Sequence, residues 1–228
     1  MIKEFEKRIG IEFEDKKLLE IAFTHRSFLN ENRQGKIKEH NERIEFLGDA
    51  VVELITTEML YKTFPKMKEG EMTAIRSAMV NTDSLSKQAE KLGMEKYLKM
   101  SKGELGSNKG RWHILANTFE AVVGAIYLEF GLEVAKEFLE ENLFPYLKTV
   151  LKNSLHQDPK SYFQEKAQDV YQKTPEYKTL AEDGPEHDKE YISGVYIGDE
   201  LVAKGKGSSK KNAEIDAAKN GLKKKDWV

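Results

Sequence analysis

The chain of 228 residues contains no cysteine, and this absence limits the metal chemistry open to it. Without thiols it can form neither disulfides nor thiolate zinc sites, so a bound metal must rest on oxygen or imidazole ligands. The first 17 residues carry charges throughout and lack the apolar stretch of a signal peptide, and no later run approaches the roughly 18 apolar residues of a membrane span. The sequence therefore predicts a soluble, cytoplasmic protein with no membrane partner.

An excess of one charge is also missing, because 37 Lys and Arg residues face 39 Asp and Glu residues, which leaves a net charge of −2. This average conceals a segregation along the chain. Between Lys204 and Lys225, eight lysines stand against only Glu214 and Asp216, a local charge of +6, whereas residues 182–190 are acidic. A surface that contacts phosphates needs such a cluster, although a solvated basic helix end has the same composition.

The spacing of apolar residues divides the chain into two parts. From residue 1 to 150 they recur at every third or fourth position, which predicts an all-α domain. Within it, NTDSLSKQAEKLG (81–93) starts with N-cap residues and closes on Gly93, a helix stop. The periodicity lapses over 151–157, where we expect a linker. Residues 158–228 then show a helix, three alternating runs and a helix, which predicts a small α+β domain of α-β-β-β-α order.

The first group of acids lies in a helix that begins near Asn41. Glu42, Glu45 and Asp49 follow at spacings of three and four residues, so their carboxylates share one helix face. Gly48 costs roughly 1 kcal/mol relative to Ala in a helix interior, so local helix propensity does not explain it. Two interpretations remain open: a solvated acidic stripe beside a close helix contact, or carboxylates that line a cleft and hold a divalent cation.

A second segment, HILANTFEAVVGAIYLEF (113–130), is almost continuously apolar and predicts a buried helix. Glu120 within it would be costly unless it were paired or bound to metal, and Asn117, one turn earlier, shares its face. Two buried helices that each present oxygen ligands would form the hard, oxygen-only site that suits Mg²⁺ or Mn²⁺. The expected substrate of such ions is a phosphodiester.

At these residues the sequence resembles bacterial ribonuclease III, a family of double-strand-specific endoribonucleases. NERIEFLGDAVV (41–52) matches the signature run of the family, THRSF (24–28) its upstream helix, and ILANTFEA (114–121) a second acidic segment that normally reads I-L-A-D-x-F-E-A. DPKSYFQEKAQ, GPEH and GKGSSKKNAEIDAA resemble the double-stranded RNA-binding domain that follows in the same family. The match runs in order over essentially the whole chain.

The resemblance implies a homodimeric endonuclease that depends on Mg²⁺, with Mn²⁺ as a substitute, and that needs no organic cofactor. It would cut both strands of double-stranded RNA in rRNA and mRNA precursors, leaving 5′-phosphates, 3′-hydroxyls and short 3′ overhangs. By position, Asp49 and Glu120 would be catalytic, with Asp49 holding or deprotonating the attacking water. The metal ligands would be Glu45, Asp49, Asn117 and Glu120. Further implied roles are auxiliary acid for Glu42 and Glu69, and dimer contact for Phe46.

Asn117 departs from the family pattern, which has Asp at this position. The amide oxygen can still coordinate a cation, but it is neutral, so the attraction for Mg²⁺ falls by one charge in a partly desolvated site. We expect weaker metal binding and slow or absent cleavage, with RNA binding and dimerisation retained. Either an introduced substitution or natural variation would explain the asparagine.

For the second domain, the resemblance implies three contacts with an RNA duplex. One minor groove would meet the first helix, His187 in the GPEHD turn would reach another, and phosphates would meet the start of the last helix. The residues concerned on the two helices are Ser161, Gln164, Glu165, Gln168, Ser208, Ser209, Lys210 and Lys211. Without the resemblance, Lys210 and Lys211 could equally be an ordinary solvated pair. His187 alone would be interpreted as a turn histidine, and His25 as a structural residue.

Two rival functions remain. One is a dimeric RNA-binding protein without catalysis, which would have no use for Glu45, Asp49 and Glu120 on two apolar helices. The other is an unrelated all-α metal phosphohydrolase, for which the expected neighbouring His-Asp ligands are missing from THRS. A cleavage assay with duplex RNA, with and without Mg²⁺, separates the three.

Overall fold

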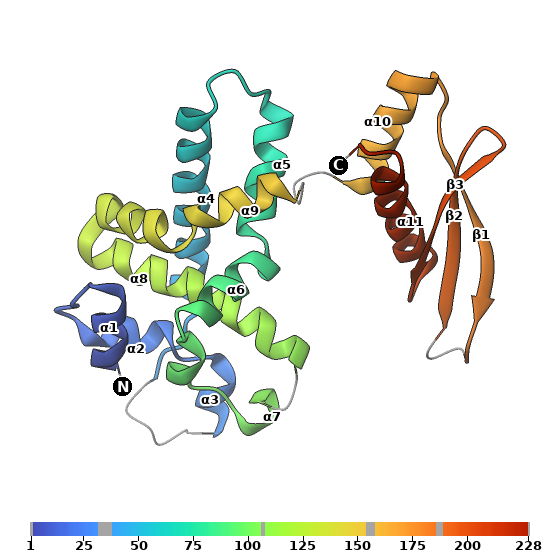
Figure 1. Ribbon diagram of the computed structural model, residues 1–228. Helices are drawn as coiled ribbons and strands as arrows, with labels where there is room; N and C mark the ends of the chain where they lie inside the picture. Colours follow the sequence, from blue (N-terminus) through green and yellow to red (C-terminus); the bar gives the residue numbers. More distant parts are fainter. Residues whose placement is uncertain (1, 32–37, 106–107, 154–157, 186–188, 228) are drawn as a thin grey trace. The chain divides into compact units, whose positions relative to one another are not determined.

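A computed structural model describes residues 2–31, 38–105, 108–153, 158–185 and 189–227 (Figure 1). The chain divides into two compact units, Met1–His156 and Gln157–Val228. Each unit has its own hydrophobic core.

The first unit is helical throughout its regular elements (Figure 1). Its helices are α1 (Ile2–Ile9), α2 (Lys16–Ala22), α3 (Arg26–Glu31), α4 (Glu42–Thr63), α5 (Glu69–Val80), α6 (Thr82–Lys91), η1 (Met94–Tyr97), α7 (Lys102–Leu105), α8 (Asn108–Asn142), η2 (Phe144–Tyr146) and α9 (Leu147–Lys152). The predicted caps of α6 are confirmed: Asn81 accepts a hydrogen bond from the Ser84 N–H at 2.9 Å, and Gly93 has a left-handed φ of +63°. Since α9 runs to Lys152, the first two residues of the expected linker, 151–157, are helical.

Helix α8 forms the centre of this unit, and its most extensive helix contact is with α4. One 18-residue window of the helical stretch Gly110–Lys152 has a mean hydropathy of 1.3. The expectation that no run is apolar enough for a membrane span was therefore wrong as far as length and composition are concerned. However, 61% of that window is buried inside the protein. Phe119, Val122 and Ile126, for example, are fully buried. The apolar composition is therefore that of a core helix packed among other helices.

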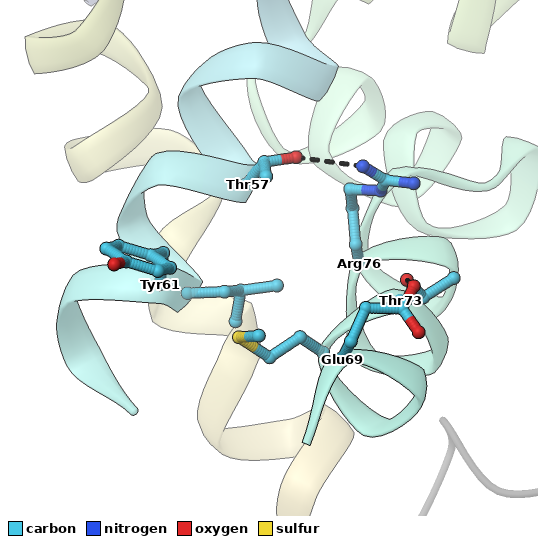
Figure 2. A pocket seen from close by; sticks show the side chains of 7 residues that line it. Thr57, Tyr61, Glu69, Thr73 and Arg76 are labelled. Atoms are coloured by element: carbon cyan, nitrogen blue, oxygen red, sulfur yellow. Dashed lines mark hydrogen bonds between the residues drawn. The ribbon is translucent and has the colours of Figure 1, made fainter. Parts of the chain in front are cut away.

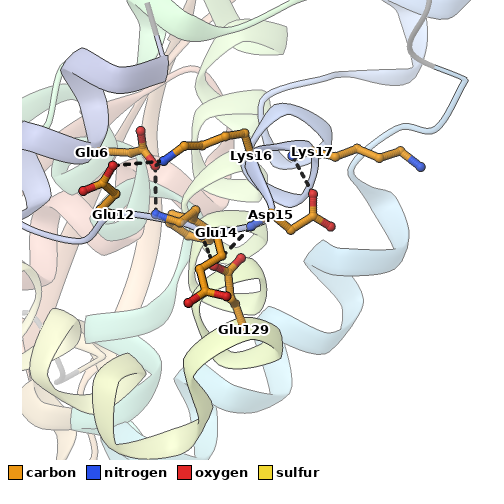
Figure 3. A network of polar contacts seen from close by, with 8 residues as sticks. Glu6, Glu12, Glu14, Asp15, Lys16, Lys17 and Glu129 are labelled. Carbon is orange, nitrogen blue, oxygen red and sulfur yellow. Dashed lines mark hydrogen bonds and ion pairs between the residues drawn. The ribbon is translucent and has the colours of Figure 1, made fainter.

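The N-terminal segment is attached to α8 by a network of carboxylates (Figure 3). Glu6, which is only 5% exposed, accepts hydrogen bonds from the Phe13 N–H at 2.8 Å and from Lys16 Nζ at 2.7 Å. Glu129 of α8 accepts hydrogen bonds from the backbone N–H groups of Glu14 and Asp15. These bonds hold the loop before α2 against α8 shortly before Gly131, where a φ of +83° interrupts the helix.

The second unit has the predicted α-β-β-β-α order, which confirms the fold class expected from sequence. Three antiparallel strands pair in the order β1-β2-β3, and the two helices pack with them around a small core. Gly205 and Gly207 of β3 allow the close approach of α11, because a Cβ at Gly205 would lie 2.0 Å from the Ala217 nitrogen. The elements are α10 (Pro159–Tyr171), β1 (Glu176–Asp183), β2 (Glu190–Ile197), β3 (Glu200–Gly207) and α11 (Lys210–Lys224).

Candidate active site and RNA-binding surface

The two acid-bearing helices, α4 and α8, touch backbone to backbone at a pair of glycines. A Cβ placed on Gly48 would lie 1.8 Å from the Glu120 carbonyl oxygen, and one placed on Gly124 would lie 2.4 Å from the Ile44 carbonyl oxygen. Atoms cannot approach so closely, so only glycine fits at these two positions. The helix propensity lost at Gly48 is thus explained by the close crossing of α4 over α8.

This crossing brings together the acids predicted from the two segments. Glu45 and Asp49 flank Gly48 on α4, and Glu120 and Asn117 lie on α8 at the same contact. Their interaction is visible in the electrostatics, since Glu120 is repelled by both Asp49 and Glu45. The structure has features of both interpretations open from sequence: Gly48 makes a close helix contact and Glu42 and Asp49 are exposed, while Glu45 and Glu120 are partly buried and repel each other.

Burial raises the pKa of the Glu120 carboxyl to about 8, and the negative charges of Asp49 and Glu45 add to the rise. Burial also raises the pKa of Glu45, as does the charge of Glu42. Opposing this, a hydrogen bond from Asn117 stabilises the Glu45 carboxylate and lowers its pKa. The site thus holds two acids, Glu45 and Glu120, whose ionised forms lack sufficient compensation from protein groups.

The chemistry of these oxygen donors fits a hard divalent cation, which would relieve the repulsion among the carboxylates. Among the described residues, however, no three His, Asp or Glu side chains are gathered closely enough to hold one ion as they stand. The fourth oxygen donor at the site, Asn117, is a neutral amide hydrogen-bonded to Glu45. Ligation would therefore require side-chain rotation about a fixed pair of helix backbones.

Glu42 faces a neighbour that the sequence reasoning did not single out, Arg26. The Arg26 Nη1 lies 3.2 Å from Glu42 Oε1, and His40 Nδ1 lies 3.8 Å from Glu42 Oε2. The contact follows from backbone pairing, because the Asn41 N–H donates to the Thr24 carbonyl at 2.9 Å. No local sequence signal reports this pairing; the only hint is that THRSF was itself a matched segment.

His25 has structural contacts, in keeping with the role expected for it. Its N–H donates to the Lys99 carbonyl at 2.9 Å, and its Nδ1 lies 2.8 Å from Ser27 Oγ, which accepts the Ser101 N–H at 3.0 Å. Burial lowers the pKa of the His25 imidazole. These contacts tie the segment before α3 to the chain around residues 99–101.

Glu69, which the resemblance places at the edge of the metal site, lies away from Glu45 within one chain. It lies at the start of α5 and lines a pocket of about 250 Å³ with Thr57, Tyr61, Thr73 and Arg76 (Figure 2). These contacts are with the C-terminal half of α4. Sixteen residues separate Glu45 from Tyr61, which is roughly 24 Å along a helix axis.

Phe46, the expected dimer contact, is 82% exposed. Leu54 and Tyr61 on the same helix are also exposed, at intervals of eight and seven residues, so the three side chains form one stripe along α4. A Phe side chain this exposed is unusual, and a row of three marks an apolar surface. This stripe runs from the acids at one end of α4 to the Glu69 pocket at the other.

The four polar residues proposed for the first helix of the second unit lie together. Ser161, Gln164, Glu165 and Gln168 are exposed on α10 at spacings that share one face, while Phe163 and Ala167 are buried on the opposite face. His187 lies outside the described residues.

At the start of α11, the predicted phosphate-contacting residues have specific partners. Ser209 caps the helix by accepting the Asn212 N–H at 3.2 Å, and the Ser208 hydroxyl accepts from Asn212 Nδ2 at 3.3 Å. Lys211 is exposed. Lys210 Nζ lies 2.8 Å from Glu182 Oε1, a pairing across to β1 that the sequence did not predict. Thus one of the two lysines already has an anionic partner in the absence of RNA.

The fold and these sites define a class of protein: a helical domain with converging acids joined to a module of the type that binds RNA. Comparison with known proteins makes this specific. Residues 15–147 match the family described as Ribonuclease-III-like, and residues 159–225 match the double-stranded RNA binding motif. The chain belongs to the ribonuclease III family and is, as such, an endoribonuclease with a double-stranded RNA-binding domain.

Individual relatives support this assignment over nearly the full length. Ribonuclease 3 of Bdellovibrio bacteriovorus is 43% identical over 98% of this chain and 95% of its own. Ribonuclease 3 of Nitratiruptor sp. is 44% identical over 97% and 96% respectively. Among solved structures, the nuclease domain of Campylobacter jejuni ribonuclease III is 39% identical, with a TM-score of 0.56, and covers 64% of this chain and 99% of its own. The resemblance seen in the sequence is confirmed.

Proposed function

We propose that this protein hydrolyses phosphodiester bonds in double-stranded RNA with the help of Mg²⁺, for which Mn²⁺ can substitute. The observation that carries the proposal is the convergence of Glu45, Asp49 and Glu120 at the Gly48–Gly124 crossing. Burial raises the pKa of Glu45 and of Glu120, and the neighbouring carboxylates add to the rise, a pattern that is common at functional sites.

The proposed division of labour follows from position. Asp49 is exposed at the crossing and would hold the attacking water and accept its proton, while Glu45 and Glu120, being more buried, would hold the cation with Asn117. A bound divalent ion would supply an acidified water and offset charge on the leaving 3′ oxygen. Glu120, with its pKa of about 8, must lose a proton at neutral pH before it can serve as an anionic ligand.

Asn117 weakens this proposed site. Its amide contributes no charge. The amide NH2 donates the hydrogen bond to Glu45, and an aspartate at this position would have no such donor. We expect cleavage by this chain to be slow compared with a chain carrying aspartate at that position. Loss of one anionic ligand leaves the RNA-binding surface of the second unit untouched, since that surface lies outside the helical unit.

We also propose a homodimer paired along the α4 stripe of Phe46, Leu54 and Tyr61. The stripe has an exposed aromatic side chain at one end and the pocket beside Glu69 at the other. Pairing two copies of α4 about a twofold axis would bring each Phe46 toward the opposite pocket and each Glu69 toward the opposite acids. The Campylobacter jejuni relative is described as having a region of its nuclease domain involved in dimer formation.

The RNA-binding surface would be formed by the exposed face of α10 and by Ser208, Ser209, Lys210 and Lys211 at the start of α11. Polar side chains on α10 suit 2′-hydroxyls of a minor groove, and the lysines suit phosphates. We place the protein in the cytoplasm and take precursors of rRNA and mRNA as its substrates, as the family resemblance implies.

The decisive experiment incubates the full chain with a labelled RNA duplex in Mg²⁺, Mn²⁺ or EDTA and resolves the products on a denaturing gel. Asn117→Asp is run in parallel, because it restores the expected charge, and Asp49→Asn serves as the inactive control. We expect metal-dependent products with 5′-phosphates, faster with Asn117→Asp. If the unchanged chain and the Asn117→Asp variant both bind the duplex without cutting it, the non-catalytic RNA-binding alternative is correct instead.

A further inference from the structure

Arg26 is held beside the acids of the α4–α8 crossing by backbone hydrogen bonds. The carbonyl of Thr24 accepts the N–H of Asn41, the residue before α4, and the N–H of His25 donates to the Lys99 carbonyl, both at 2.9 Å. Thr24 itself is fully buried. The main chain that carries Arg26 is therefore fixed relative to the first turn of α4, and the direction of its side chain is restricted.

The guanidinium is fixed at one end and open at the other. Its Nη1 lies 3.2 Å from Glu42 Oε1, while its side chain stays 69% exposed. Glu42 is in turn approached by His40 on its second oxygen, at 3.8 Å. An arginine has five N–H donors, and a single contact with Glu42 leaves most of them directed to solvent.

The negative charge around the crossing disfavours a polyanion such as RNA, and the positive charge of Arg26 opposes this effect. Arg26 lies near enough to Glu45 to lower its pKa, against the combined effect of burial, Glu42 and Asp49. An RNA strand that approached these acids would be repelled by the carboxylates of Glu42, Glu45 and Asp49, and also by that of Glu120 once it loses its proton. A fixed cation adjacent to the acids offsets this repulsion at the phosphate next to the reacting bond.

We propose that Arg26 binds a non-bridging oxygen of the scissile phosphate and that Glu42 is the positioning residue that orients it. This inference rests on the proposed function and adds a second source of positive charge to the site. Arg26 would hold the phosphate even when no divalent ion is bound, so its contribution can be measured as binding rather than as activity.

The experiment uses duplexes in which both cleaved linkages are replaced by neutral methylphosphonates. The positions come from cleavage by the Asn117→Asp chain in Mg²⁺. Binding of native and substituted duplexes to the full wild-type chain and to Arg26→Ala is measured by fluorescence anisotropy in EDTA. Arg26→Lys keeps the charge and guards against loss of fold, which circular dichroism also checks. Lys17→Ala is the matched control, since Lys17 is 67% exposed and paired with one glutamate at 2.9 Å.

We expect the methylphosphonates to weaken wild-type binding by about fivefold, and Arg26→Ala to weaken binding of the native duplex by a similar factor. Because both changes remove the same contact, combining them should cost no more than either alone. Arg26→Lys should lie between, and Lys17→Ala should respond to the methylphosphonates as wild type does.

Losses that multiply when the two changes are combined would overturn the assignment of Arg26 while leaving the proposed nuclease function intact. If instead the Asn117→Asp chain cut no duplex in Mg²⁺ or Mn²⁺, the proposed function would fail, and the role of Arg26 with it.

Discussion

The α-carbon of Gly48 faces the carbonyl oxygen of Glu120 so closely that a methyl group at residue 48 would lie 1.8 Å from it. The backbone positions of Glu45 and Asp49 relative to Glu120 are therefore fixed by the contact between the two helices. The closeness that favours a divalent cation is set by the helices themselves.

Gly48→Ala should destabilise the protein by at least about 2 kcal/mol, because the helices must separate to admit the methyl group. Gly70→Ala is the control: it lies in helix α5 with open space around it and should be neutral or slightly stabilising. Urea unfolding followed by circular dichroism measures both. Equal stability of the two variants would contradict the tight crossing.

The stability of the metal-free protein should fall as pH rises from about 5 toward 8. The folded-state pKa of Glu120 is raised to about 8, above the ordinary value for an unfolded chain, so the folded state binds the extra proton between the two values. The free energy of unfolding then decreases by up to about 1.4 kcal/mol per pH unit over that range. Thermal melts in EDTA test this, and Glu120→Gln should flatten the dependence.

Asn117→Asp should raise the affinity for Mn²⁺ by about tenfold or more, since one full charge is added to a partly desolvated site. Isothermal titration calorimetry measures this binding directly, without substrate. In EDTA the same change should lower the melting temperature, because the new carboxylate repels Glu45 instead of donating a hydrogen bond to it. An unchanged affinity for Mn²⁺ would show that residue 117 is not a ligand of the metal site.

Phe46→Asp should convert the protein to a monomer at micromolar concentration, because a charge would replace the exposed aromatic side chain on the α4 stripe. Val170→Asp is the control, as Val170 is an exposed apolar residue of the second unit. Light scattering coupled to size exclusion distinguishes monomer from dimer. A Phe46→Asp chain that remained dimeric would require another interface.

Glu182→Gln should tighten RNA binding by about two- to threefold at low salt, a gain in the range expected for an exposed ion pair. Its two carboxylate oxygens lie 2.8 Å from Lys210 Nζ and 3.1 Å from Lys189 Nζ, so in the free protein Glu182 competes with phosphate for both lysines. Glu176→Gln, which loses only a pairing with Lys178, is the matched control. Anisotropy titrations over a salt series measure the slope of log affinity against log salt concentration. If Glu182 had no such role, the Glu182→Gln variant and the unchanged chain would show equal slopes.

Local features of this protein were predictable because they depend on spacing. The shared face of Glu45 and Asp49, the caps of α6 and the α-β-β-β-α order all follow from residues within a few positions of one another. The sequence also identified Gly48 as a residue that helix propensity does not favour. It could not identify Gly124 as the residue opposite, because pairing between α4 and α8 is decided by packing of the whole core.

Contacts between distant parts of the chain were not predictable, for the same reason. Glu69 was placed at the edge of the metal site on the basis of resemblance; its helix packs beside the far half of α4, and the proposed dimer is what would bring it to the acids of the other copy. Glu42 was expected to be an auxiliary acid and Lys210 a phosphate contact, and the sequence predicted neither ion pair that they form with Arg26 and Glu182, which come from distant parts of the chain. Ion pairs between separate elements produce no periodic pattern in a sequence, so these partners could be identified only from the structure.

The presence of two separate hydrophobic cores means that damage to one half of the molecule need not reach the other. A substitution that silences the acids in the helical half leaves the RNA-contacting half folded and competent. Such a chain would sequester transcripts without cutting them, and inside a cell it would compete with intact copies. Loss of catalysis in this protein is therefore expected to behave as a dominant trait.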